Sequence, residues 1–252
     1  MKKFIYLNIF YLLLRREIGI LTEDFRILYR CTKLLEELGK SYVILSDSKE
    51  AYKYPVILTT KNIRGENIVF LKNVDIDVRR AIPLLYGRKR FNNLYIGVDP
   101  GKTVGLAALG DGLILEKRNV YSISSLKKFV SIWLEGYPSQ NYTLRVGNGS
   151  PTERNEIIMN LFGKVDIEVV DERATSITKE DSDAAVRIAR IRGRKIYRIP
   201  SISISDGEIR NIQRLSRIES HGKITISREM AKKVILGEIT LRDAIERTLQ
   251  KN

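Results

Sequence analysis

The segment IGVDPGKTVGLAAL, from Ile96 to Leu109, decides the fold. Its first apolar residues predict a strand that carries one carboxylate, Asp99, at its C-terminal end. Gly101 and Gly105 follow, and glycine lets the backbone turn close to that carboxylate because it has no Cβ. The simpler alternative is a strand and turn with an aspartate cap. We favour a functional acid at a strand end.

The elements on either side of this segment extend the pattern. Gly110-Asp111-Gly112 predicts a hairpin turn, and the apolar periodicity then alternates between helix and strand. The expected order is three hairpin strands, helix, strand, helix, strand, helix, which is the RNase H-like arrangement of a mixed sheet with flanking helices. The expected strands are 94–98, 106–109, 113–115, 142–146 and 167–170, and the expected helices are 124–134, 152–161 and 183–191.

The flanking regions differ in character from this centre. Residues 1–90 alternate short β-rich runs with a helical stretch, which predicts a small α/β accessory domain with a partial parallel sheet. Residues 91–200 form the expected RNase H-like domain, after a basic joint at Arg88 to Arg90. Residues 201–252 predict a helical C-terminal tail, with helices over 206–218, 227–236 and 241–249. The fold class is therefore α/β.

Two further acidic segments follow the first. The apolar run at 167–170 ends in Asp171-Glu172-Arg173, which by itself is typical of a solvated loop. Glu180 and Asp183 are three residues apart, so they share a helix face, and small residues behind them allow the helix to pack against a sheet. By itself that pair is an acidic first turn stabilised by the helix dipole.

The three segments together resemble RuvC-like resolvases and YqgF-like proteins of the RNase H-like superfamily. The resemblance covers about the middle hundred residues. It implies a metal-dependent nuclease that cleaves phosphodiester bonds in structured or branched DNA or RNA. It also implies catalytic roles for Asp99, Glu172 and Asp183, and metal binding by these three together with Glu180. Glu172 is preferred to Asp171 from the resemblance, since adjacent strand residues face opposite sides of a sheet.

The chemistry explains why such acids gather. Hydrolysis of a phosphodiester needs an activated water and a stabilised leaving oxygen, and two divalent ions about 3.5–4 Å apart can serve both. Mg²⁺ and Mn²⁺ prefer carboxylate and water oxygens. We therefore expect Mg²⁺ or Mn²⁺ as the cofactor.

One departure from the resolvase pattern favours a different function. Resolvases of this family carry a glutamate on the fourth strand, whereas this strand, 144–148, reads LRVGN without an acid. A non-catalytic module that binds nucleic acid or RNA is therefore the alternative. An ATPase of the actin and Hsp70-like class is a third hypothesis, from the spacing of Asp99, Gly101 and Thr103. It ranks last, because such proteins need two RNase H-like halves and this chain has one.

The charge favours a nucleic-acid partner. The chain has 252 residues with a net charge of +14 and a pI near 9.8, and cations that meet phosphates release counterions. Arginines recur every three or four residues after the acids, and they would share one side if the helix continues; the alternative is a solvated helix face. The residues assigned to nucleic-acid binding are Lys102, Arg173, Arg187, Arg190, Arg194, Arg198, Arg210, Arg214 and Arg217.

The remaining expectations concern the environment of the protein. One cysteine, Cys31, excludes an intrachain disulfide and fits a small buried residue. The apolar stretch from Phe4 to Leu14 is too short to span a bilayer, so we expect a buried strand or an extension from a misplaced start codon, and a cytoplasmic protein without a membrane partner. The composition is typical of a thermophilic source. Symmetric cutting of two strands favours a homodimer.

Overall fold

The computed structural model describes residues 17–171, 184–199, 206–235 and 238–250. The chain divides into two compact units, residues 1–200 and residues 201–252. The first unit contains two sheets and the second is helical, so the expected class, α/β with a helical tail, is confirmed. The stretch from Phe4 to Leu14 lies outside the described residues.

The first sheet is parallel and has four strands in the order β2-β1-β3-β4. Its strands are β1 (Ile18–Leu21), β2 (Tyr42–Ile44), β3 (Val56–Thr59) and β4 (Ile68–Phe70). The short apolar runs of the sequence thus form the expected partial parallel sheet. Parallel strands are apolar on both faces because both faces are covered, and β1 and β3 are buried throughout.

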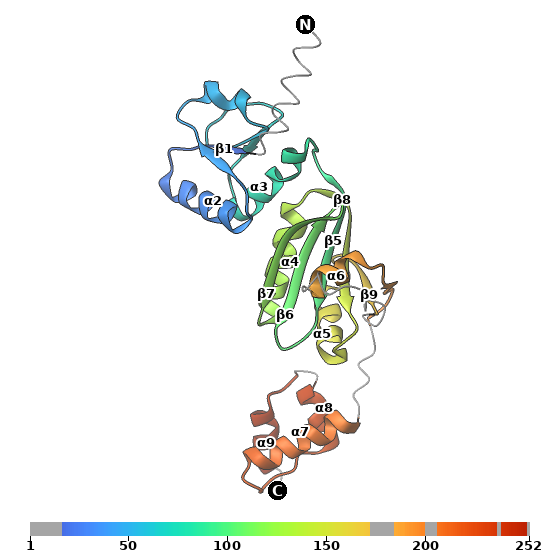
Figure 1. The fold of residues 1–252 in the computed structure, drawn as a ribbon. Coiled ribbons are helices and arrows are strands. Elements are labelled where there is room, and N and C mark those ends of the chain that lie inside the picture. Colours follow the sequence, from blue (N-terminus) through green and yellow to red (C-terminus); the bar gives the residue numbers. More distant parts are fainter. Residues whose placement is uncertain (1–16, 172–183, 200–205, 236–237, 251–252) are drawn as a thin grey trace. The chain divides into compact units, whose positions relative to one another are not determined.

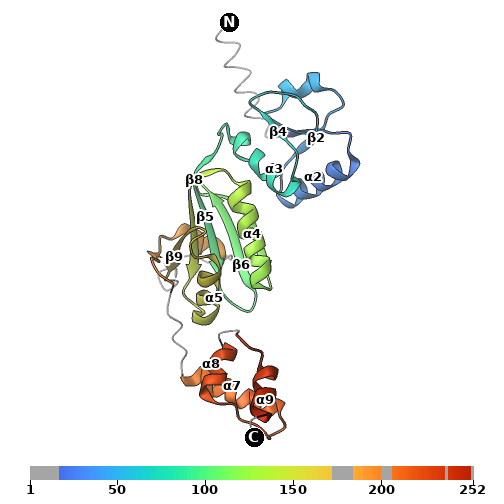
Figure 2. The ribbon, with the colours of Figure 1, turned by 180° about the vertical axis from the view of Figure 1, so that it is seen from behind.

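Two helices cover one face of this sheet (Figures 1 and 2). They are α2 (Phe25–Glu37) and α3 (Val74–Ala81), and the latter was not expected from the sequence. Asp24 caps α2 through its carboxylate, which accepts hydrogen bonds from the backbone of residues 26 and 27. The 3₁₀ turn η1 (Ser48–Lys53) precedes β3, and η2 (Pro83–Tyr86) leads into the second sheet.

The second sheet is mixed and has six strands in the order β10-β9-β8-β5-β6-β7. The central strand β5 is antiparallel to β6 and parallel to β8, and β8 is parallel to β9. This topology confirms the RNase H-like arrangement predicted from the order of elements. The strands are β5 (Phe91–Asp99), β6 (Val104–Gly110), β7 (Leu113–Val120), β8 (Ser139–Gly147), β9 (Asp166–Val170) and β10 (Arg194–Lys195).

The predicted boundaries were too short at some strands. β7 extends to Val120 rather than ending at 115, and β5 begins at Phe91. The hairpin turn is confirmed, since Asp111 and Gly112 both have positive φ, as a tight turn of this kind requires. Polar residues in β7 hid its length, because Glu116 is buried in an ion pair rather than exposed to water.

The helices lie on opposite faces of the mixed sheet (Figures 1 and 2). α4 (Ile123–Gly136) and α5 (Pro151–Leu161) cover one face, where alternate strand residues such as Ile96, Val98 and Leu144 enter the main apolar core. α6 (Ala184–Arg190) covers the other face and packs on β5, β6 and β8. α5 begins with Pro151, after the N-cap residue Ser150.

The second unit contains α7 (Asp206–Glu219), α8 (Arg228–Ile235) and α9 (Leu241–Leu249), close to the expected ranges. A small apolar core that includes Ile209, Ala231 and Ala244 holds them together. Thr240 and Asp243 form a capping box at the start of α9. Within the described parts of the chain, helices long and apolar enough to cross a membrane are absent.

Candidate active site

The predicted acid Asp99 is the last residue of β5 and is partly buried. Its cross-strand neighbour on β6 is Gly105. On the other side, the register of β5 with β8 pairs Val98 with Val146, which brings Gly147 level with Asp99. A glycine on each side leaves space around the carboxylate on this face of the sheet.

Helix α6 lies directly on the same face. A Cβ at Gly97 would stand 2.0 Å from the backbone oxygen of Ala185, so only glycine allows this close approach. A Cβ at Gly105 would stand 3.4 Å from the Cβ of Asp99 and 3.5 Å from the Cβ of Ala185. The Cβ atoms of Asp99 and Ala185 are therefore both close to Gly105, and the beginning of α6 lies beside Asp99.

The strand β9 ends at the same edge. Its last residue, Val170, pairs with Gly147 of β8, and the exposed Asp171 follows. Because β5, β8 and β9 are parallel, their carboxyl ends lie together at one edge of the sheet. With strands about 4.8 Å apart, the ends of β5 and β9 are separated by roughly 10 Å.

The other predicted site residues on this edge, namely Glu172, Arg173, Glu180 and Asp183, lie outside the described residues. Of the four predicted metal ligands, Asp99 is therefore the one that lies within the described residues. Across the described ranges there is no group of three or more acidic, histidine or cysteine side chains arranged to hold a metal ion. The metal site therefore stays a prediction.

A partly buried ion pair that sequence reasoning missed lies under α6. Arg145 of β8 is 6% exposed, and its Nε donates to Oε2 of Glu168 on β9 at 2.9 Å. Its Nη1 donates to the backbone oxygen of Ala189 at 2.6 Å, and its guanidinium lies 3.8 Å from the centre of the Tyr95 ring. Oε2 of Glu168 also accepts from the backbone nitrogen of Gly193 at 3.0 Å.

This pair fastens the end of α6 to the sheet. Arginine suits such a place because its planar group binds a carboxylate, a carbonyl and an aromatic face at once. The signal in the sequence was a charge within each of two apolar strands, LRV and IEV. In a strand buried on both faces, a charge needs a partner.

The predicted arginine series does not lie on one helix. Arg187 and Arg190 belong to α6, but the helix ends at Arg190 and Arg194 lies in β10. Arg198 follows two residues after Ile196, whose nitrogen still bonds to the oxygen of Ile167. These arginines would share one side only if the helix continued, and it does not, because Gly193 packs against the backbone of Val169 and turns the chain into the sheet.

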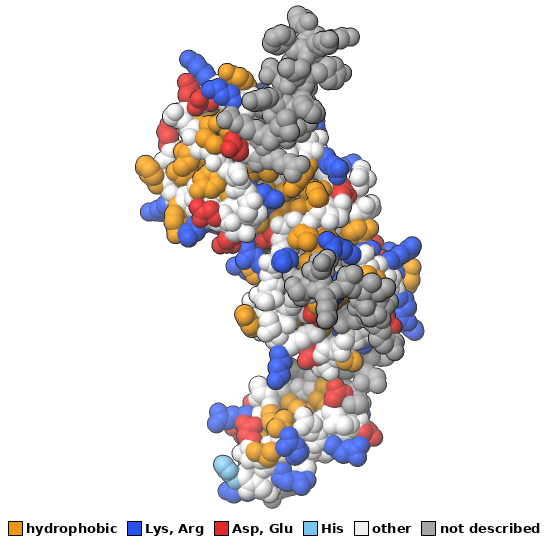
Figure 3. Space-filling view, viewed as in Figure 1, with side chains coloured by type: hydrophobic (Ala, Val, Ile, Leu, Met, Phe, Trp, Pro, Cys, Tyr) orange, Lys and Arg blue, Asp and Glu red, His pale blue; other side chains and the backbone are white. Residues whose placement is uncertain are grey.

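The second arginine series is on one helix. Arg210, Arg214 and Arg217 are exposed on α7, at spacings of four and three residues that share a face. Lys102 is exposed in the turn that follows Asp99. Basic side chains are distributed over both units in Figure 3. They therefore give a basic surface without identifying its ligand.

Comparisons with known proteins give a distant result. No curated protein sequence matches this chain. Among solved structures, the Argonaute of Marinitoga piezophila in complex with a 5′ OH guide RNA is similar over 62% of this chain, at 14% identity and a TM-score of 0.26. The match spans 39% of that Argonaute chain.

One family model, described as a three helical bundle domain, matches residues 205–250. These residues are the ones that form α7, α8 and α9. The chain therefore combines a small parallel α/β unit, an RNase H-like mixed sheet and a region similar to three-helical-bundle domains.

Proposed function

We propose that the protein is a metal-dependent nuclease of the RuvC/YqgF type, which cleaves phosphodiester bonds in structured or branched nucleic acid. The observation that carries this proposal is the position of α6. The helix starts at Ala184, immediately after the predicted ligand Asp183, and Ala185 adjoins Asp99. We therefore expect the acidic segment that ends at Asp183 to reach the sheet edge where Asp99 lies.

The donor set fits a hard divalent cation. Asp99, Glu172, Glu180 and Asp183 would hold Mg²⁺ or Mn²⁺, since carboxylate oxygens are the ligands that these ions prefer. Bound there, the ions would stabilise the attacking and leaving oxygens of the displacement. Glu168 faces α6 through its bond to Arg145. If the alternation of β9 continued past Val170, Glu172 rather than Asp171 would lie on that side.

The remaining residues of the site would bind and position the substrate. Gly105 and Gly147 leave room beside Asp99, so a phosphate can approach that carboxylate closely. Lys102 is exposed in the next turn, and Arg187 and Arg190 lie on α6. Guanidinium groups bind phosphate through paired hydrogen bonds. We assign these cations, and the arginine face of α7, to the nucleic-acid backbone.

A non-catalytic nucleic-acid-binding module is the second candidate. The observation that favours it is the glycine level with Asp99 on β8, where a resolvase would supply a further acid. The nearest charged side chain on that face of β8 is the cation Arg145, which is already bonded to Glu168. Binding would then use the same basic surface without hydrolysis.

The test compares the natural chain with Asp99→Asn on branched, duplex and single-stranded substrates in the presence of Mn²⁺. We expect cleavage by the natural chain and a loss of at least ~100-fold in Asp99→Asn, more than the 10- to 100-fold typical of residues that only support a ligand. Asp75→Asn is the matched control, since Asp75 is a half-exposed acid on α3 that pairs with Arg30, and this variant should cleave normally.

Each alternative result identifies a rival. Binding without cleavage by either protein would leave the binding module as the function. Turnover of ATP would promote the actin-like class instead. Cleavage by Asp99→Asn at the natural rate would remove Asp99 from the site and with it the nuclease proposal.

A further inference from the structure

The edge of the mixed sheet at β10 is built from basic and aromatic residues. β10 pairs on one side only, with β9, so it is the outermost strand. The segment from Arg194 to Arg198 reads RKIYR. Arg194, Lys195 and Arg198 are exposed, and Tyr197 is 82% exposed. An aromatic ring this open has no role in the core.

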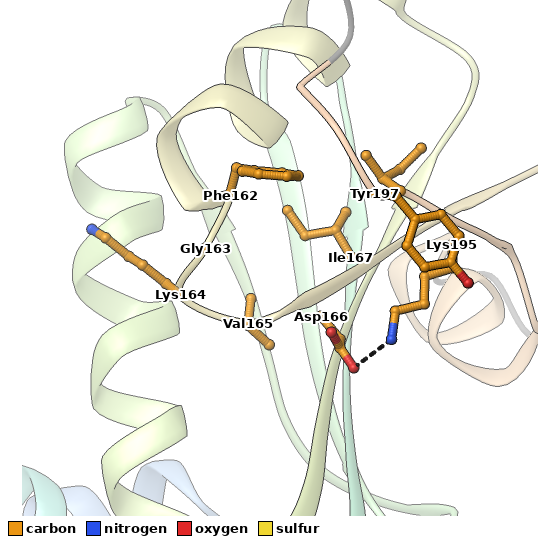
Figure 4. Close-up of a pocket in the computed structure, with 9 residues that line it drawn as sticks. Phe162, Gly163, Lys164, Val165, Asp166, Ile167, Lys195 and Tyr197 are labelled. Carbon is orange, nitrogen blue, oxygen red and sulfur yellow. Dashed lines mark hydrogen bonds and ion pairs between the residues drawn. The ribbon is translucent and has the colours of Figure 1, made fainter.

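Two hollows lie along this edge. One, of about 510 Å³, is lined by all five residues from Arg194 to Arg198. The other, of about 500 Å³, lies between the turn before β9 and the same segment. In Figure 4, Phe162 and Ile167 stand on one side of the second hollow, and Lys195 and Tyr197 on the other. Both hollows are open to solvent.

One charged side chain beside the Tyr197 ring is Lys195, which is paired with an acid. Lys195 donates to Asp166 at 2.9 Å, and this bond raises the pKa of the Lys195 ammonium above its ordinary value. The same ammonium lies 5.8 Å from the centre of the Tyr197 ring. Asp166 is thus paired with Lys195, and the exposed Arg194 and Arg198 flank Tyr197 in the sequence.

Part of this edge lies on the same face of the sheet as the candidate active site. Lys195 pairs with Glu168, which points towards α6, so Lys195 lies on the α6 face of the sheet. Tyr197 follows two residues later, and the ammonium contact keeps its ring on the same side. Asp99 is on that face as well. A strand bound at the edge would therefore run on the side of the sheet where cleavage is proposed.

We propose that the β10 edge binds a single-stranded segment of DNA or RNA, with a base stacked on Tyr197 and phosphates held by Arg194 and Arg198. Open aromatic rings between cations are the elements that hold single strands without regard to sequence. This inference rests on the proposed function and specifies its substrate class, a structured nucleic acid with an unpaired segment. The rival explanation is that cations at an edge strand only prevent edge-to-edge association.

The experiment measures binding by the full chain in EDTA, where a metal-dependent cleavage reaction cannot proceed. Labelled DNA and RNA single strands of about 12 nucleotides and a duplex of equal length are titrated by fluorescence anisotropy. We expect Tyr197→Ala to weaken single-strand binding by roughly 5- to 150-fold, the effect of one lost base stack. Duplex binding should change little, and Tyr197→Phe, which keeps the ring, should bind like the natural chain.

Tyr121→Ala is the matched control. Tyr121 is also a surface tyrosine, 80% exposed, but it follows β7 at the opposite edge of the sheet, and its loss should not alter binding. A second measurement uses Arg194→Gln with Arg198→Gln. Removing two phosphate contacts should lower the slope of log affinity against log salt by about 1.4 for a single strand.

The outcomes separate this inference from the nuclease proposal. Unchanged single-strand binding by Tyr197→Ala would overturn the inference, even if cleavage depends on Asp99. Self-association of the arginine variants with unchanged binding would also overturn it, in favour of edge protection. Tyr197-dependent binding in a protein that never cleaves would uphold the inference and remove the nuclease proposal. The DNA and RNA arms decide which strand is preferred.

Discussion

Among the described residues, the α4 face of the mixed sheet contains a buried arginine–glutamate pair and the α6 face a partly buried one, and the two pairs are built differently. On the α4 face, Nε and Nη2 of Arg79 bind both carboxylate oxygens of Glu116, at 2.5 and 2.9 Å. The two side chains are 2% and 3% exposed. On the α6 face, Arg145 makes a single bond to Glu168, and those side chains are 8% and 16% exposed.

The first pair joins the two sheets of the larger unit. Arg79 comes from α3 and Glu116 from β7, and Tyr137 donates a further hydrogen bond to Glu116 at 2.7 Å. Burial lowers the pKa of the Arg79 guanidinium, but the hydrogen bonds and charge of Glu116 outweigh burial and raise it. The Arg79 guanidinium therefore stays charged at every ordinary pH, and its bonds to Glu116 are a permanent structural connection.

The second pair holds α6 in its position on the sheet. Arg145 binds the backbone of Ala189 near the end of that helix, and Glu168 binds the backbone of Gly193 beyond it. Glu168 keeps some exposure to water. The pair on the α4 face therefore stabilises the fold, whereas the pair on the α6 face positions the helix that adjoins Asp99.

The largest expected effect is on the α4 face. Arg79→Met should lower the free energy of unfolding by about 3–5 kcal/mol, since it leaves a carboxylate buried without its main partner. Denaturation in urea measures the loss. The double variant Arg79→Met with Glu116→Met should recover most of it, because an apolar pair replaces the ion pair. If the free energy of unfolding of Arg79→Met lies within about 1 kcal/mol of that of the natural chain, the pair does not join the sheets.

The next effect concerns the packing of α6. Gly97→Ala should cost about 3 kcal/mol, because its Cβ would overlap the backbone of Ala185 and the helix must move. Gly105→Ala is the matched control on the next strand, where a Cβ makes only ordinary contacts of 3.4 Å or more. It should stay within about 1 kcal/mol of the natural chain. Equal stability of the two variants would contradict the close contact at Gly97.

A smaller loss of stability is expected from the second pair, with a different consequence. Arg145→Met should cost about 2 kcal/mol, the value of a hydrogen bond to a charged group. It should also lower cleavage by roughly 10-fold, because the end of α6 loses its attachment to the sheet. Arg79→Met, measured below its unfolding transition, should cleave normally. If both variants lose cleavage equally, the two faces do not differ in the way proposed.

The smallest effect is a pH dependence on the α4 face. Burial, together with the charge of Glu116, raises the pKa of the Tyr137 hydroxyl well above its ordinary value of 10.0. The folded state therefore keeps this proton when the unfolded state loses it, so the stabilisation is complete below pH 10 and declines as the pH rises above it. Tyr137→Phe should cost about 1 kcal/mol at neutral pH and flatten the alkaline decline. An unchanged decline would exclude Tyr137 as its source.

Much of the fold was predictable because its signals are local. The alternation of apolar residues, the glycines of the hairpin turn and the cap at Asp24 each act within a few residues, and they gave the order of the strands and helices. The length of β7 and the existence of α3 were missed. In both, charged residues that look exposed in the sequence are buried, because Glu116 and Arg79 satisfy one another across 37 positions.

The candidate site was likewise predictable only where its signals are local. The sequence by itself determined that Asp99 ends an apolar strand followed by glycines, and that a basic chain of RNase H-like order would offer this acid at a sheet edge. Only the tertiary structure decided that α6 lies against β5, that Arg145 is bonded beneath it, and that the arginines after α6 turn into an edge strand. Local periodicity cannot reveal such facts, because they depend on close contact between segments that are distant in the chain, and there the packing of backbone against glycine sets the geometry.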